Sequence, residues 1–178
     1  PRAIAFSIKG LVKYNEVFKD AQINEVLQKL ASRLAASYRL HHTAAHPWFE
    51  TKITYGNAVL PEALLLVAQI DGNRNFQQIA MKSFHYLCDL HFENNHFTVI
   101  SNQTWYEPGM LIASTGEQPI DVAYTILALS TFYELTGNNH YLLQMKKAFD
   151  WYLGKNQLSQ IVYNPVSGGC LDGIEANE

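Results

Sequence analysis

Three carboxylates are the residues best placed to do chemistry, because each lies where a long loop meets a predicted helix or a glycine-rich turn. Glu62 and Asp121 fall in the first turns of predicted helices, and Asp172 lies in the loop 168–173. Carboxylates that converge on a cleft can act as general acid and base on a glycosidic bond, or can bind sugar hydroxyls. Acidic residues in a first turn also complement the helix dipole, so Glu62 and Asp121 have a purely structural interpretation as well.

Metal and nucleophile chemistry has weaker support. The histidines fall into two groups in the sequence: His41, His42 and His46, and then His85, His91 and His96. Neither group has the i, i+4 spacing with an adjacent Glu that is typical of a hydrolytic zinc site. Two cysteines, Cys88 and Cys170, cannot form a disulfide framework or a four-ligand zinc site. Serine-nucleophile, phosphate-loop and dinucleotide signatures are absent, so we expect no metal site and no cofactor.

Aromatic residues make up 12% of the chain, and many lie outside the periodic segments. Aromatic side chains in loops either seal a core or form the wall of a binding site. Here they occur in three polar and aromatic clusters, Pro47-Trp48-Phe49-Glu50, Trp105-Tyr106-Glu107 and Tyr163-Asn164-Pro165. Helix packing alone does not require such clusters, which favours a binding surface.

Composition excludes several classes of protein. The chain has 178 residues, of which 48% are hydrophobic and 16% charged, so it can bury a sizeable core and is not intrinsically disordered. The net charge of −3 leaves no basic stripe for nucleic acid. The longest apolar run, residues 60–70, is interrupted by Glu62 and Gln69 and is shorter than the about 20 residues that a membrane span needs. We expect a cytoplasmic protein with neither nucleic acid nor membrane as a partner.

Apolar residues recur with helical periodicity, and no segment alternates as a strand would. The pattern predicts six helices, over about 2–17, 20–40, 57–70, 75–92, 119–135 and 139–153. Asp20 is a plausible N-cap, and Pro61 and Pro119 lie in first turns, where a missing N–H costs nothing. Glycine–asparagine turns at 72–73 and 137–138 separate the helices within two pairs. The predicted fold class is all-α.

The helices repeat as pairs, about 2–40, 57–92 and 119–153. Aligning Leu64 with Leu129 also places Gly72 over Gly137 and continues through the second helix of each pair. We therefore expect one repeat domain over residues 1–178, built from three helical hairpins. The chain begins inside a helical pattern, which predicts a piece of a longer polypeptide. Long connections at 41–56, 93–118 and from 154 onward alternate with the hairpin turns, so we expect them on one side of the stack.

Several motifs spread over nearly the whole chain belong together. They are Pro47-Trp48-Phe49-Glu50, Thr54-Tyr55, Asn57-Ala58, Leu60-Pro61-Glu62-Ala63-Leu64-Leu65, His96-Phe97, Trp105-Tyr106, Glu117-Gln118-Pro119-Ile120-Asp121, Ala148 to Asn156, Tyr163-Asn164-Pro165 and Gly168-Gly169-Cys170-Leu171-Asp172-Gly173. In these motifs the sequence resembles the six-hairpin, α/α-toroid carbohydrate-active superfamily, in particular the helical domain associated with glycosyltransferase-like proteins. The resemblance implies a concave end where aromatic rings stack on sugars and where carboxylates and amides bind hydroxyls.

The sequence departs from that family in two places. Relatives commonly carry an acidic residue at the position of Gly56, and they continue beyond the Gly-Gly-Cys loop into an Asn-Glu-Asn-Gln segment and a further helix, whereas this sequence ends at Glu178. Three hairpins cannot close a six-hairpin ring. We therefore expect a toroid-like stack, open or partial, that a second chain could complete.

The leading hypothesis is a carbohydrate-active helical domain that binds or processes a saccharide, with glycoside hydrolysis as the simplest reaction if it is an enzyme. The expected catalytic acids are Glu62, Asp121 and Asp172. The expected substrate-binding residues are Trp48, Tyr55, Asn57, Trp105, Tyr106, Gln118 and Tyr163. The alternatives are a non-catalytic accessory domain that docks on a glycosyltransferase domain, which the glycine at position 56 favours, and a helical-repeat scaffold for another protein or a second copy.

Overall fold

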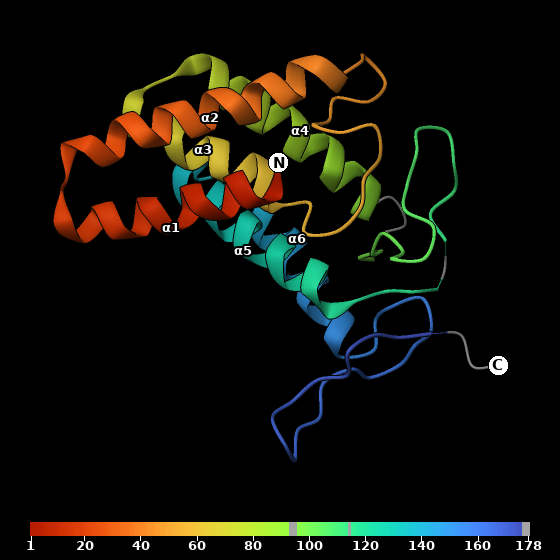
Figure 1. Ribbon diagram of the computed structural model, residues 1–178. Coiled ribbons are helices and arrows are strands. Elements are labelled where there is room, and N and C mark those ends of the chain that lie inside the picture. Colours follow the sequence, from red (N-terminus) through yellow and green to blue (C-terminus); the bar gives the residue numbers. More distant parts are fainter. Residues whose placement is uncertain (93–95, 114, 176–178) are drawn as a thin grey trace. The chain divides into compact units, whose positions relative to one another are not determined.

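The computed structural model describes residues 1–92, 96–113 and 115–175, and these residues fold into helices joined by long loops. The helices are α1 (Arg2–Phe18), α2 (Ala21–His41), α3 (Val59–Asp71), α4 (Arg74–Phe92), α5 (Pro119–Thr136) and α6 (His140–Tyr152) (Figure 1). Extended backbone pairs within the described ranges only as isolated bridges, without a strand. The prediction of an all-α chain is confirmed.

The chain forms two compact units. The first comprises residues 1–51 and 58–86, and the second comprises residues 52–57 and the chain from Leu87 onward. Helix α4 therefore contributes to both, with Tyr86 as its last residue in the first unit and Leu87 as its first residue in the second.

In the first unit, α1 packs against α2 and α3, and α2 also contacts α3. Figure 1 shows α1 and α2 as an antiparallel hairpin. Ala5, Ile8 and Val12 are the buried residues of α1, and their spacing of three to four places them on one face. The Asp20 carboxylate caps α2 as predicted, because it accepts a hydrogen bond from the Gln22 N–H at 2.8 Å.

In the second unit, α5 and α6 pack together as a hairpin. The turn between them uses Gly137, whose φ of +68° suits a residue without a side chain, and its N–H donates to the Tyr133 carbonyl at 2.8 Å. Across the hairpin, the Phe132 ring contacts the Tyr141 ring edge to face at 5.7 Å.

Parts of all three long connections meet in the second unit. Ile53 of the first connection exchanges two backbone hydrogen bonds with Tyr106 of the second, at 2.9 and 3.0 Å. Glu117 at the end of the second connection pairs in the same way with Ile174 of the third, at 3.3 and 3.0 Å. Binding and catalytic residues often lie on loops that a rigid scaffold positions, so the loops of this unit are the candidate location of a functional site.

Among the described residues, none of the helices is long and apolar enough to cross a bilayer.

Candidate functional site

The beginning of α5 holds a loop of the first connection in place. Asp121 lies in the first turn of α5 and is only 3% exposed. Its Oδ1 accepts hydrogen bonds from the backbone N–H and the side-chain Nδ2 of Asn57, at 3.4 and 3.5 Å. Asn57 in turn exchanges hydrogen bonds with the backbone of Thr54, at 3.2 and 3.1 Å. The pair predicted as catalytic acid and binding amide therefore fixes the conformation of residues 54–57.

Glycine at position 56 has a physical reason in this loop. Gly56 has a φ of +55°, in the left-handed region where a side chain is strained. An acidic residue there would carry that strain in the present loop conformation.

Tyr55, which the same loop carries, lies beside Trp105. The two ring centroids are 6.0 Å apart with an interplanar angle of 38°. Tyr55 is 50% exposed and Trp105 is half-buried, so both side chains keep part of their surface in contact with solvent. Trp105 also has a φ of +54°, which is rare for a residue other than glycine and is concentrated at functional sites. Of the predicted aromatic residues, these two form a pair that solvent can reach.

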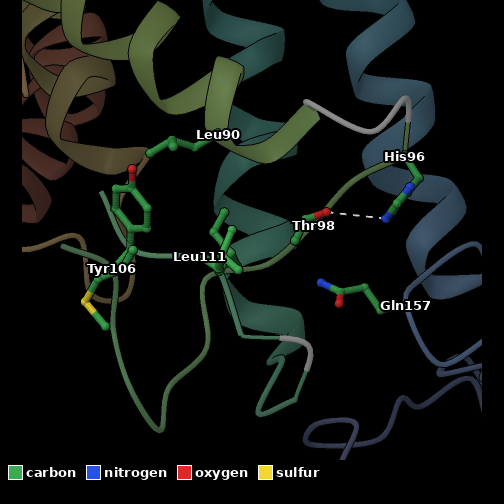
Figure 2. A pocket seen from close by; sticks show the side chains of 8 residues that line it. Leu90, His96, Thr98, Tyr106, Leu111 and Gln157 are labelled. Atoms are coloured by element: carbon green, nitrogen blue, oxygen red, sulfur yellow. Dashed lines mark hydrogen bonds between the residues drawn. The ribbon is translucent and has the colours of Figure 1, made fainter. Parts of the chain in front are cut away.

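Tyr106 lines a different feature of the same unit, a cavity of about 480 Å³. Figure 2 shows Leu90, Tyr106 and Leu111 on one side of it, and Thr98, His96 and Gln157 on the other. The Thr98 hydroxyl lies 3.4 Å from His96 Nε2. The remaining lining residues are Met110 and Ile112. One wall is therefore mainly apolar and the other carries hydroxyl, imidazole and amide groups, which suits a ligand with a flat apolar face and polar edges.

Tyr163 lies at a second cavity, also of about 480 Å³, at the end of α6. Phe149, Tyr152 and Leu153 of the α6 end form one part of it, and residues 168–170 form another. The Tyr152 hydroxyl donates to the Pro119 carbonyl at 2.8 Å. This cavity is more apolar in its side chains than the first, and Tyr163 does not belong with Tyr55 and Trp105.

The remaining predicted site residues differ in burial. Gln118 is half-buried directly before α5, and Asp172 is exposed. Glu62 is 3% exposed in the first unit, where its Oε2 accepts an ion-pair hydrogen bond from Lys9 Nζ at 2.5 Å. Trp48, also in the first unit, has no exposed surface and packs edge to face on Phe49. We leave Trp48 out of any ligand-binding surface, because a ring without exposed surface seals the core instead.

Glu117 is a carboxyl that the sequence did not single out. It is 1% exposed, its Oε2 accepts a hydrogen bond from Trp151 Nε1, and its Oε1 has no partner among the described residues. Burial raises the pKa of the Glu117 carboxyl to about 7, and the Trp151 hydrogen bond only partly opposes this. In the sequence, Glu117 stands out only as part of the motif at residues 117–121, and that motif does not show whether its side chain is buried.

Buried His91 is a second group with an altered pKa. Its Nδ1–H donates to the Thr98 carbonyl at 2.6 Å, while Nε2 has no partner among the described residues. Burial lowers the pKa of His91 to about 4. Three or more His, Cys, Asp or Glu side chains do not come together as a metal site anywhere in the described part of the chain.

No protein-family model matches the chain, and a comparison with curated proteins finds no match.

Proposed function

We propose that this chain is a carbohydrate-binding helical domain whose saccharide site lies in the second unit, at Tyr55 and Trp105. The observation that carries the proposal is the solvent-accessible pair of Tyr55 and Trp105, whose ring centroids are 6.0 Å apart, beside a loop whose conformation Asn57 and Asp121 fix. Aromatic rings with one exposed face offer large apolar area at low conformational cost, which suits the C–H face of a pyranose.

The acids have different roles in this proposal. Asp121 is a positioning residue, because its carboxylate is buried and engaged with Asn57. Asp172 is exposed, so of the three predicted acids it is the one that a ligand of this unit can reach. The cavity that Tyr106 lines supplies hydroxyl and amide groups for a further part of the ligand. On the resemblance alone, we assign the three hairpins to an open part of an α/α toroid.

A glycan-array screen of the whole chain tests the proposal. We expect binding to at least one glycan, and a loss of at least tenfold in affinity for Tyr55→Ala and for Trp105→Ala, since hot-spot aromatics contribute about 2 kcal/mol or more. Tyr14→Ala is the matched control, because Tyr14 and Phe18 also form an exposed stacked pair, but in the first unit. No binding by the folded chain, or full binding by both variants, would refute the proposal.

Turnover is measured on the same glycans. Loss of turnover with retained binding in Asp172→Asn would make the domain an enzyme with Asp172 as a catalytic acid. Asp121→Asn is expected to weaken binding, because it disturbs the Asn57 contacts that hold residues 54–57.

A second candidate function is docking on a glycosyltransferase domain or on a second copy. It is favoured by the apolar residues at the cavity near Tyr163, where Phe149 is 54% exposed and Leu153 is 48% exposed. Sedimentation of the chain alone and with a glycosyltransferase domain would show this association, and Phe149→Glu should abolish it.

A further inference from the structure

Glu117 makes two kinds of contact at the start of α5, one through its backbone and one through its side chain. The backbone exchanges hydrogen bonds with Ile174, which is 1% exposed. Gly173 packs so closely that a Cβ at this position would lie 3.0 Å from the Glu117 carbonyl oxygen. These interactions, which we call the 173–174 contact, fix the chain near its C-terminal end to the residue that carries the buried carboxyl.

The side chain of Glu117 is in a site that suits a neutral carboxyl group. The Trp151 indole N–H donates to Oε2, and Oε1 has no partner among the described residues. One hydrogen bond does not compensate a buried carboxylate for the loss of its hydration, whereas the neutral acid loses far less on burial. Ionisation of Glu117 therefore favours any rearrangement that admits water to Oε1.

We propose that Glu117 is a proton-dependent switch, in which the neutral carboxyl keeps the 173–174 contact closed and the ionised carboxylate opens it. Opening moves Gly173 and Ile174 away from the start of α5 and lets water reach the carboxylate. The device does not depend on saccharide binding, although Gln118, the next residue, would be exposed by it.

Titratable groups on the elements around Glu117 have partners of their own or face solvent. Among them are Asp121 in α5, Asp150 and Tyr152 in α6, and Asp172 and Glu175 beside the 173–174 contact. Asp150 pairs with Lys146 and Lys155, and Glu175 accepts a hydrogen bond from Gln103 at 2.9 Å. Burial is the cause of the raised pKa of Glu117, and the Trp151 hydrogen bond opposes it only in part; at about 7, this pKa places the change within the neutral range.

Amide hydrogen exchange tests the proposal on the whole chain. The Glu117 and Ile174 N–H groups report the 173–174 contact directly. After correction for intrinsic exchange, we expect their protection factors to fall by about 70-fold between pH 5 and 8, which corresponds to a carboxyl pKa of 4.5 in the open form and about 7 in the closed form. The Tyr106 N–H, bonded to the Ile53 carbonyl in the same unit, should show no such fall.

Three variants complete the test. Glu117→Gln should keep protection high at every pH, Gly173→Ala should keep it low at every pH, and Glu175→Gln should behave as wild type. If Glu117→Gln fails to fold, carbon-13 titration of the wild-type Glu117 carboxyl decides. A pKa near 4.5, protection that does not change with pH, or the same fall in Glu117→Gln as in wild type would each overturn the proposal.

Discussion

His91 and Glu117 are buried in the same unit, and burial moves their pKa values in opposite directions because it disfavours a cation in one and an anion in the other. A histidine with a depressed pKa contributes stability that is present above pH 6.5 and is lost as the pH falls through about 4. A carboxyl with a raised pKa contributes stability that is present below pH 4.5 and is lost as the pH rises through about 7. Between pH 4.5 and 6.5 the two dependences oppose each other.

We predict that His91→Gln removes one of these opposing dependences. The wild-type free energy of unfolding should change little between pH 4.5 and 6.5 as far as these two groups determine it. In His91→Gln the free energy of unfolding should fall as the pH rises over this range. Its change from pH 4.5 to 6.5 should differ from that of the wild type by about 3 kcal/mol at most. Urea unfolding followed by tryptophan fluorescence measures this free energy at each pH. A variant whose pH profile runs parallel to that of the wild type would contradict the assignment.

Lys9 and Glu62 form an ion pair in the first unit, which gives the buried Glu62 carboxylate a structural role. Because the Glu62 side chain is 4% exposed, removal of its cation leaves a buried charge. Lys9→Met should therefore lower the free energy of unfolding by about 3 kcal/mol. The double variant Lys9→Met/Glu62→Gln should recover part of that loss in thermal or urea unfolding. If Lys9→Met has no effect, the ion pair is not what holds Glu62.

Sequence alone could not identify Glu117 or correctly place Trp48. Glu117 pairs through its backbone with Ile174 and through its side chain with Trp151, both far along the chain, so no local pattern reports its burial. Trp48 lies in a polar and aromatic cluster like Trp105, yet one ring seals a core and the other remains half-exposed. Composition and spacing do not show whether a loop tryptophan is buried or accessible, because tertiary contacts determine its burial.

At the scale of elements, prediction succeeded where signals are local. Helix periodicity, the Asp20 cap and the glycine turns each depend on residues within a few positions, and the six helices lie close to their expected ranges. The third helix begins at Val59 instead of about 57, because Asn57 is engaged with Asp121 in the loop before it.

A comparison of two glycines in the first unit distinguishes the effect of backbone conformation on stability from that of side-chain packing. A Cβ would meet nothing within 4 Å at Gly10 or at Gly72, but Gly72 has a φ of +68° at the end of α3, whereas Gly10 lies within α1. Gly10→Ala should stabilise the chain by about 0.5–1 kcal/mol, and Gly72→Ala should destabilise it by about 1 kcal/mol. Thermal unfolding checks both. Equal effects of the two substitutions would contradict the conformational argument.

At the scale of the whole molecule, the compact units do not follow the three helix pairs of the sequence repeat. The first connection is divided between the units after Thr51, and α4 is divided after Tyr86. A repeat pattern reports which residues share a helix face, whereas the partition into units depends on contacts between distant segments. The candidate surface of Tyr55 and Trp105 arises in this way, from two connections that the repeat leaves outside its helices.

The most direct test of saccharide binding uses the three tryptophans as separate reporters in one NMR titration. Their environments differ, because Trp48 and Trp151 are fully buried and Trp105 is half-exposed beside Tyr55. When a glycan selected on the array is added, the indole N–H signal of Trp105 should shift in a saturable way, while the signals of Trp48 and Trp151 stay in place. Saturable glycan binding that leaves the Trp105 signal unchanged would contradict the proposed site, and the lack of any glycan that binds would contradict the proposed function.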